Sequence, residues 1–188
     1  TVRASASTGF KAPLLHQIYT QKAQYSFIPG QGIQVGGLIN NVSREARLLG
    51  LPSLSPEKSL NLTFGVGLRP ISGLSLTIDY YNIAVEDRIV LSTEIGSVES
   101  LGPDEGINRI LAENNLSDLS FFVNALDSRT SGIDFVSSYR NIELGAGKMS
   151  VNLSGNYMLQ NEREGDVKNP RLVEESGQSV VNATQEAL

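Results

Sequence analysis

The sequence predicts an all-β fold, an antiparallel up-and-down meander whose strands suit the wall of a transmembrane β-barrel. Three observations lead to this prediction. Apolar and polar residues alternate with a period of two over several runs, which indicates strands with one apolar face. The residues on the polar face are small and neutral. Short and long connections between the runs alternate along the chain.

Five runs carry the alternation, so we expect about five or six strands. The most regular run covers residues 59–69, where Leu60, Leu62 and Phe64 alternate with Ser, Asn, Thr and Gly without a break. Successive side chains of a strand point to opposite faces, so each run has one apolar and one polar face. The runs cover residues 2–7, 59–69, 74–80, 130–139 and 149–160.

The connections between these runs are of two kinds. Residues 69–73 form a tight turn, because Pro70 presets φ and Gly73 accepts a positive φ. Residues 141–148 form a second short link. The other connections are long loops, which cover approximately residues 9–56, 92–119 and 161–176. Loops of this length are usually functional. We expect a flexible loop at the glycines of residues 30–37 and a short helix at residues 106–115.

Two architectures fit strands with these faces. In a soluble sandwich the apolar face packs against a second sheet, and in a transmembrane barrel it contacts lipid. The polar faces lack the Lys and Glu that are usual on a solvated sheet, which favours the barrel. A tilted strand of about 10 residues climbs roughly 26 Å, close to a hydrocarbon thickness. Short turns at one end and long loops at the other are also typical of such barrels.

Composition excludes several classes of function. The chain has 188 residues and a net charge of −5, so it lacks the basic surface that binding to nucleic acid requires. It contains no Cys and one His, so we expect no metal site, and we find no motif for a cofactor or an enzyme reaction. No apolar run approaches the roughly 18–20 residues of a membrane-spanning helix.

Four segments, in order, resemble sequence motifs of the TonB-dependent outer-membrane receptors. The first resembles R-x-S-x-S-x-G-F-R-A-P, with Lys11 where the family usually has Arg. The second resembles L-x-P-E-x-S-x-N-x-E-x-G, with Thr63 in place of the common Glu. The third is similar to D-Y-Y-x-I-x-I-x-D-R-I, and the fourth to F-x-N-A followed by G-I-D. These segments cover residues 3–19, 54–65, 76–89 and 122–134.

The resemblance implies a partial wall of a large barrel that closes with about 22 strands. The chain is then an internal fragment, residues 1–188, of the C-terminal barrel domain, most similar to receptors of the Bacteroidetes group. The plug domain, which passes the action of TonB to the barrel, is missing from it. The implied function is energised uptake of a scarce nutrient, such as a ferric siderophore, haem, cobalamin or a glycan, across the outer membrane of a Gram-negative bacterium.

Two other functions remain alternatives at this point: a soluble secreted β-sandwich that binds glycans, and a β-rich hydrolase. The hydrolase lacks a visible catalytic constellation. The sandwich differs from the barrel in what covers the apolar face.

The barrel prediction assigns the residues of each face. We expect one set to face the plug or the lumen: Asn61, Thr63, Asp79 and Asn152. We expect another set to contact outer-membrane lipid: Leu60, Leu62, Phe64, Val66, Leu76, Ile78, Val151 and Leu153. In the first long loop, four residues are candidates for contacts with a small-molecule or glycan ligand: His16, Tyr19, Tyr25 and Phe27. A piece of wall has two open edges, so we also expect the isolated fragment to associate with itself.

Overall fold

The computed structural model describes residues 1–30, 32–145 and 147–182, with the side chain of residue 28 left out. The chain divides into two compact units. Unit 1 comprises Thr1–Gly9, Lys58–Val85 and Ser128–Glu162, and unit 2 comprises Phe10–Glu57, Glu86–Asp127 and Arg163–Leu188.

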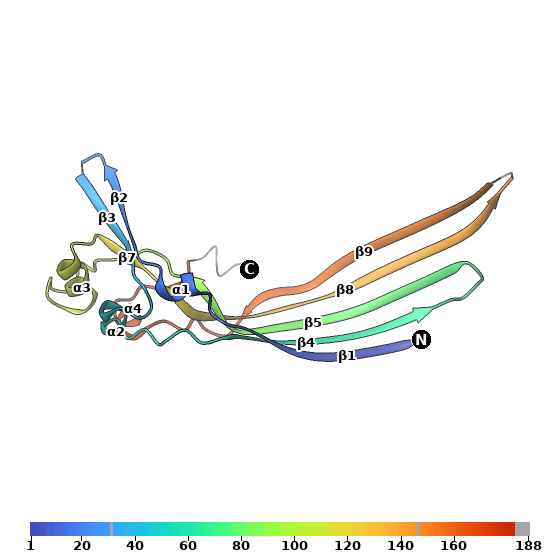
Figure 1. Ribbon diagram of the computed structural model, residues 1–188, viewed down its shortest axis with the longest axis horizontal. Helices are drawn as coiled ribbons and strands as arrows, with labels where there is room; N and C mark the ends of the chain where they lie inside the picture. The colour runs from blue at the N-terminus through green and yellow to red at the C-terminus, as the bar shows by residue number, and fades with distance from the viewer. Residues whose placement is uncertain (31, 146, 183–188) are drawn as a thin grey trace. The chain divides into compact units, whose positions relative to one another are not determined.

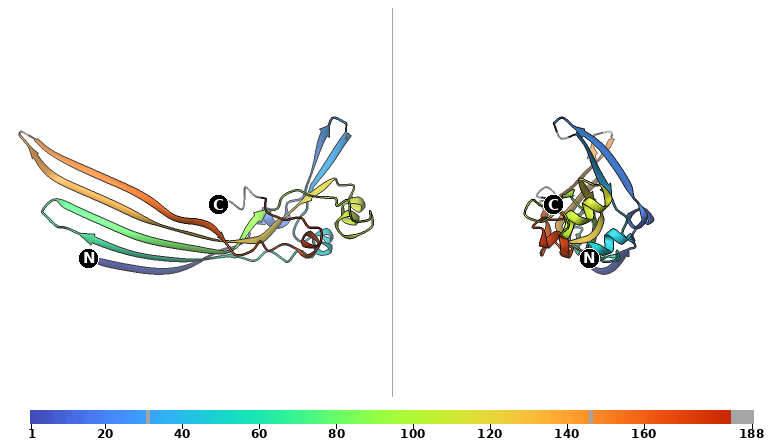
Figure 2. Two further views of the ribbon diagram at one scale, coloured as in Figure 1. Left: turned by 180° about the vertical axis from the view of Figure 1, so that it is seen from behind. Right: turned by 90° about the vertical axis from the view of Figure 1, so that its left-hand side faces the viewer.

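A five-stranded sheet forms unit 1, in the order β1-β4-β5-β8-β9. Neighbouring strands run in opposite directions (Figure 1), and they lie side by side in one sheet in the left view of Figure 2. The order along the sheet follows the order along the chain, which confirms the predicted meander. The strands are β1 (Val2–Lys11), β4 (Glu57–Leu68), β5 (Leu74–Leu91), β8 (Phe122–Leu144) and β9 (Gly147–Glu164).

A short turn joins β4 to β5, as the sequence predicted. The short link expected at residues 141–148 is largely strand, because β8 continues to Leu144 and β9 begins at Gly147. In the β4–β5 turn Gly73 adopts a φ of +85°, and the Leu74 N–H donates to the Ile71 carbonyl at 3.2 Å. Only glycine adopts such a φ without steric cost, so the Pro-to-Gly spacing of this turn fixes its conformation.

The sheet of unit 1 is a single layer without a hydrophobic core. Leu60, Phe64 and Leu153 are exposed by 44, 51 and 60%. Every buried hydrophobic residue in the described part of the chain belongs to unit 2. Apolar side chains of a sandwich are covered by the facing sheet, so the sandwich alternative is wrong for this sheet.

Unit 2 contains a second, smaller sheet in the order β2-β3-β7-β6. β2 and β3 form an antiparallel hairpin, and β3 pairs with β7 in parallel, with Gly36 opposite Asp118. These strands are β2 (Lys22–Ile28), β3 (Gly32–Leu38), β6 (Ile95–Gly96) and β7 (Asp118–Ser120). The helices of the unit are α1 (Leu15–Tyr19), α2 (Arg44–Leu48), α3 (Gly106–Asn114) and α4 (Arg171–Glu175).

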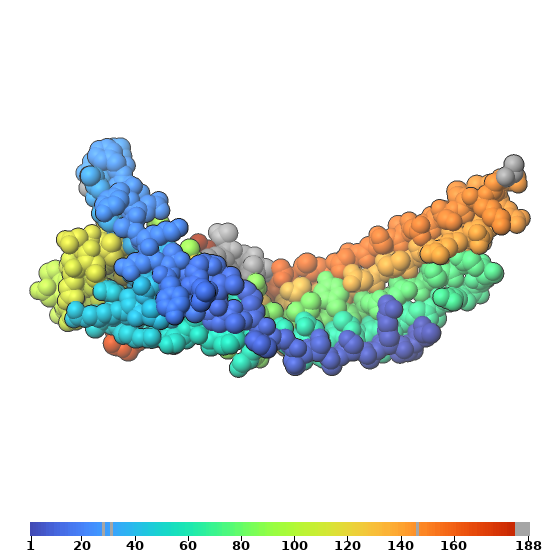
Figure 3. All heavy atoms as spheres, viewed as in Figure 1, coloured from blue at the N-terminus to red at the C-terminus, as the bar shows by residue number. Residues whose placement is uncertain are grey.

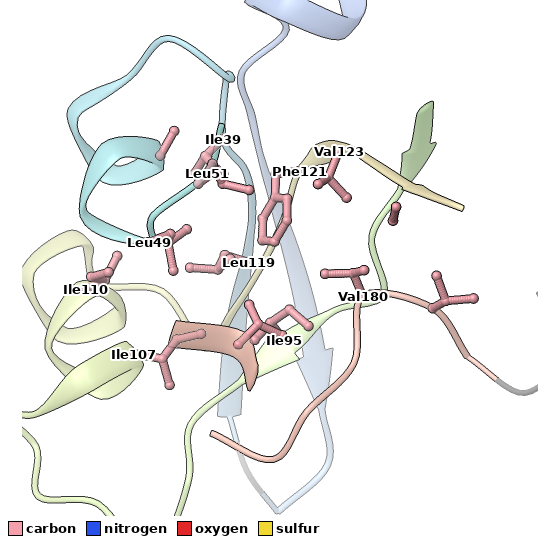
Figure 4. Packing of buried hydrophobic residues seen from close by; sticks show 14 of the residues in the cluster. Ile39, Leu49, Leu51, Ile95, Ile107, Ile110, Leu119, Phe121, Val123 and Val180 are labelled. Atoms are coloured by element: carbon pink, nitrogen blue, oxygen red, sulfur yellow. The ribbon is translucent and has the colours of Figure 1, made fainter. Parts of the chain in front are cut away.

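The hydrophobic core of unit 2 draws on segments that are far apart in the sequence (Figure 4). Leu49, Ile95, Leu119 and Phe121 are fully buried there, and Val180 joins them from the last segment described. Burying one such side chain contributes roughly 1.5–3 kcal/mol, so this cluster stabilises segments that have little regular structure of their own.

The stretches expected as long loops, about 9–56, 92–119 and 161–176, therefore contain helices and strands. The expected flexible loop at residues 30–37 is wrong for its described part, because Gly32–Leu38 is strand β3. The glycines serve close packing there: a Cβ on Gly37 would lie 2.7 Å from the Leu116 Cδ1 atom. The short helix expected at residues 106–115 is confirmed as α3, which ends at Asn115 with a φ of 52°.

Candidate functional site

The polar side chains of unit 1 bond to one another across neighbouring strands. Ser5 Oγ on β1 lies 3.1 Å from Thr63 Oγ1 on β4. Towards the opposite edge of the sheet, the Ser138 hydroxyl on β8 donates to Asn152 Oδ1 on β9 at 2.7 Å. Cross-strand pairs of this kind stabilise a sheet and fix its register. The polar face is therefore an ordered hydrogen-bonded surface.

One ion pair on this face crosses a whole strand. Arg3 on β1 donates from Nε to Asp79 Oδ1 on β5 at 2.8 Å, and its Nη2 contacts Asp79 Oδ2. Strand β4 lies between β1 and β5. The pair passes over Gly65 of β4, where an added Cβ would lie 1.8 Å from Asp79 Oδ1 and 2.9 Å from Arg3 Nε. The absence of a side chain at Gly65 is thus what lets the two charges meet.

A second bridge has the same form on the neighbouring strands. Asn156 on β9 donates from Nδ2 to the Tyr81 hydroxyl on β5 at 3.1 Å and to Asp134 Oδ1 at 2.8 Å. Between β5 and β9 lies β8, and a Cβ on its Gly132 would be 2.4 Å from the Tyr81 hydroxyl oxygen. Again a glycine on the middle strand leaves room for a side chain that crosses it.

Three of the four residues predicted to face the lumen belong to these contacts: Thr63, Asp79 and Asn152. Asn61 lies two residues before Thr63 on β4, so its side chain points to the same face of the sheet. The sequence did not indicate Arg3, Tyr81 or the role of Gly65 and Gly132. Their partners are found only once the strand order is known, since Arg3 and Asp79 are 76 positions apart.

In unit 2, residues from all four motif segments meet. Glu57 Oε1 accepts a hydrogen bond from Lys11 Nζ at 3.2 Å and from the Ile89 N–H at 3.1 Å. Lys11 stands where the family usually has Arg, and it keeps the positive charge that this contact needs. Asn124 donates from Nδ2 to the backbone carbonyls of Ser55 and Asp87.

Asp87 adopts a left-handed backbone, with a φ of 56°, and the side chains of Asn124, Asp127 and Lys168 form hydrogen bonds with it. Its N–H donates to Asp127 Oδ1 at 2.8 Å, and Lys168 Nζ donates to Asp87 Oδ1 at 2.7 Å and Asp127 Oδ1 at 2.9 Å. Burial lowers the pKa of Lys168, but the hydrogen bonds and charges of Asp87 and Asp127 outweigh it, so its pKa is raised. Lys168 lies outside the four motifs, and sequence reasoning missed it.

The predicted ligand contacts lie on α1 and β2 of unit 2. His16 packs edge-to-face against Phe122, with ring centroids 5.9 Å apart. Tyr25 and Phe27 lie two residues apart on β2, opposite Val35 and Ile33 of β3, and both rings are more than 70% exposed. The space-filling view shows this hairpin as a narrow projection (Figure 3). The exposed surface is apolar, and among the described residues neither His16 nor Tyr19 forms a ring contact with Tyr25 or Phe27.

The part of the chain that the structure describes contains neither a cluster of metal-binding side chains nor a membrane-spanning helix. There, no three His, Cys, Asp or Glu side chains gather closely enough to hold a metal ion. No helix among the same residues has the length and apolar character needed to cross a membrane.

Comparison with known proteins identifies the sheet. The family described as "TonB dependent receptor-like, beta-barrel" matches residues 1–183. The chain belongs to this family. The predicted resemblance is therefore confirmed, and the five-stranded antiparallel sheet is part of the wall of a TonB-dependent receptor barrel.

Two solved receptor structures are similar to this chain over part of their length. A mutant of the ferric enterobactin receptor PfeA from Pseudomonas aeruginosa is 20% identical, with a TM-score of 0.50, over 85% of this chain and 20% of that one. The siderophore receptor PirA from the same organism is 20% identical, with a TM-score of 0.46, over 86% of this chain and 26% of that one. The chain thus spans about a fifth to a quarter of these receptors. Comparison with curated proteins finds no match.

The Gly65 crossing gives a double-mutant test. We predict that Gly65→Ala destabilises the full-length receptor by about 1–3 kcal/mol, because the new methyl group collides with the Asp79 carboxylate. In an Asp79→Ala background the same substitution is expected to cost clearly less, since the colliding atoms are gone. Thermal denaturation of the four proteins in detergent measures the coupling. If Gly65→Ala lowers the stability equally in the wild type and in the Asp79→Ala background, the Asp79 side chain does not pass over Gly65 and the interpretation is wrong.

The Lys168 contacts predict a dependence on alkaline pH. Because the pKa of Lys168 is raised in the folded state, its stabilising contribution is present below the ordinary lysine value of 10.5 and is lost as pH rises through the raised pKa. Denaturation of the full-length receptor at a series of alkaline pH values is expected to show this loss in the wild type and not in Lys168→Met. The exposed Lys58→Met serves as a control that keeps the wild-type profile, and a Lys168→Met profile like that of the wild type would refute the assignment.

Proposed function

We propose that the chain is part of the barrel wall of an outer-membrane receptor of a Gram-negative bacterium, which imports a scarce nutrient with energy supplied through TonB. The observation that carries the proposal is the single-layer sheet with two chemically different faces. One face exposes large apolar side chains, and the other is hydrogen-bonded within itself. Hydrocarbon and a polar barrel interior are the surroundings that suit two such faces.

In this proposal the apolar residues Leu60, Leu62, Phe64, Val66, Leu76, Ile78, Val151 and Leu153 contact lipid. Asn61, Thr63, Asp79 and Asn152 face the plug or the lumen. Thr63, Asp79 and Asn152 already have partners in the wall, so a plug domain contributed by another part of the full protein meets three polar side chains that are already hydrogen-bonded. TonB acts through that plug.

The edges of the sheet are β1 and β9. Unpaired edge strands present backbone donors and acceptors that pair with other strands. In the complete receptor we propose that neighbouring wall strands occupy both edges, and that the isolated fragment pairs through them with copies of itself.

The ligand is a ferric siderophore, haem, cobalamin or a glycan, and we assign part of its contact surface to His16, Tyr19, Tyr25 and Phe27. The structurally similar PfeA is a ferric enterobactin receptor, which supports the first of these classes. Exposed rings at Tyr25 and Phe27 offer flat apolar contacts at a low entropy cost.

Neighbouring residues of β4 test the placement in the membrane. The chain contains no cysteine, so Leu62→Cys and Thr63→Cys each add one thiol to it. With the full-length receptor in liposomes, we predict that nitroxide-labelled lipids quench a fluorophore at position 62 strongly and one at position 63 weakly. Equal quenching at the two positions, or stronger quenching at position 63, would contradict the lipid-facing assignment.

Transport is tested in cells that express the full-length receptor. We predict accumulation of at least one of the four ligand classes, with radiolabelled ferric enterobactin as the first probe, and its loss when a protonophore removes the proton gradient. The double variant Tyr25→Ala, Phe27→Ala is expected to weaken binding roughly tenfold or more, as loss of aromatic contacts does at interfaces. Leu15→Ala, which is also exposed, is the control. Absence of energised uptake for all four classes would refute the transport proposal.

A further inference from the structure

Two arginines lie together at the β4–β5 turn of unit 1. Arg69 directly follows β4, and Arg140 belongs to the last part of β8. Both line a hollow of about 550 Å³ at this turn. Among the described residues, neither arginine forms an ion pair. Both side chains are exposed, so the hollow is a contact surface and not a closed pocket.

Gly73 connects the two arginines. It belongs to the turn that Arg69 begins, and its carbonyl accepts a hydrogen bond from the Arg140 N–H at 2.9 Å. A Cβ on Gly73 would lie 2.5 Å from the Arg140 carbonyl oxygen, so the close approach of β8 to the turn requires a glycine. At Gly65 a glycine also lies between two charged residues, but those are an arginine and an aspartate that bond to each other. At Gly73 both neighbours are arginines, which cannot pair with each other.

The guanidinium of Arg140 belongs to the polar face of the sheet. Its Nε donates to the Ser138 hydroxyl at 3.3 Å, and that hydroxyl donates to Asn152 Oδ1. The alternation of β4, continued to Arg69, places this residue on the same face as Thr63, because the two are six positions apart. In the proposed function this face is enclosed by the barrel. A partner of the two arginines therefore comes from inside the barrel and not from the lipid.

Guanidinium groups restrict the chemistry of that partner. An arginine stays protonated at physiological pH, so it cannot adapt to burial by losing its charge. A charge that is enclosed without a partner is strongly destabilising. A metal cation would be repelled, and an apolar side chain would leave the N–H donors without acceptors. A carboxylate fits, because its two oxygens accept the paired N–H donors of a guanidinium.

We propose that Arg69 and Arg140 together bind one carboxylate side chain of the plug domain and so anchor the plug to the wall at the β4–β5 turn. This inference rests on the proposed receptor function and assigns a contact within it. Charge complementarity supports it. Thr63, Asp79 and Asn152 are already hydrogen-bonded within the wall, whereas the two arginines offer charged donors to whatever covers this end of the polar face.

Carbodiimide coupling in the full-length receptor tests the anchor. The reagent activates a carboxylate, which then joins a neighbouring amine as an amide with loss of water. With Arg140→Lys in isolated outer membranes, we expect mass spectrometry to find an amide between the amine at position 140 and an Asp or Glu of the plug. The control is Arg44→Lys, which adds an amine at an exposed position of α2 and is expected to give no amide to the plug.

Removal of the two charges gives a second measurement. The double variant Arg69→Ala, Arg140→Ala is expected to raise the rate at which chymotrypsin cleaves the plug about tenfold or more, because charge-assisted hydrogen bonds are lost. The matched variant Arg69→Lys, Arg140→Lys keeps both charges and is expected to retain most of the resistance. Circular dichroism checks that all of these barrels are folded.

Three coupling results would overturn the proposal: no amide to the plug, coupling of position 140 only to a phospholipid phosphate, or equal coupling to the plug in Arg44→Lys. Plug cleavage that the double alanine variant leaves unchanged in a folded barrel would also overturn it.

The uptake measurement separates this inference from the receptor function. If the receptor inserts into the outer membrane and shows energised uptake but gives no coupling to the plug, the anchor is wrong and the transport proposal stands. If the receptor is absent from the outer membrane and no energised uptake occurs, the transport proposal is wrong, whatever the coupling shows.

Discussion

A sheet of one layer has no interior, so its polar side chains must find their partners sideways, within their own face. This constraint governs unit 1. Arg3 bonds to Asp79 across the strand that carries Gly65, and Asn156 bonds to Tyr81 across the strand that carries Gly132. In each case the two partners lie two strands apart. Such bridges tie three strands together without any layer above them. The apolar side chains of the opposite face, among them Leu60, Phe64 and Leu153, stay exposed.

Unit 2 follows a different rule, because its segments are stabilised by burial. Leu49, Ile95, Leu119 and Phe121 supply a core, and polar groups around Asp87 hold a backbone conformation that is uncommon for a residue with a side chain. The motif residues Lys11, Glu57, Asp87 and Asn124 all act here, through hydrogen bonds to backbone or to one another. Their sequence pattern thus reflects the local architecture of unit 2.

The sequence predicted those parts of the fold that depend on residues close together in the chain. Alternation over residues 59–69 marked β4, and Pro70 with Gly73 marked its turn, because both signals lie within a dozen residues. The core of unit 2 was missed because α1, α2 and α4 have five residues each and are too short to show helical periodicity. The parallel pairing of β3 with β7 joins residues about 80 positions apart, and the partners Arg3–Asp79 and Tyr81–Asn156 likewise depend on a strand order that periodicity does not contain.

The central claim is that hydrocarbon, and not protein, covers the apolar face of the five-stranded sheet. The most direct measurement is an electron cryomicroscopy structure of the full-length receptor in lipid nanodiscs. The account predicts acyl-chain density against Leu60, Phe64 and Leu153, with Asp79 and Arg3 paired on the enclosed side of the wall. Protein density from a second β-layer packed against those three side chains would contradict it.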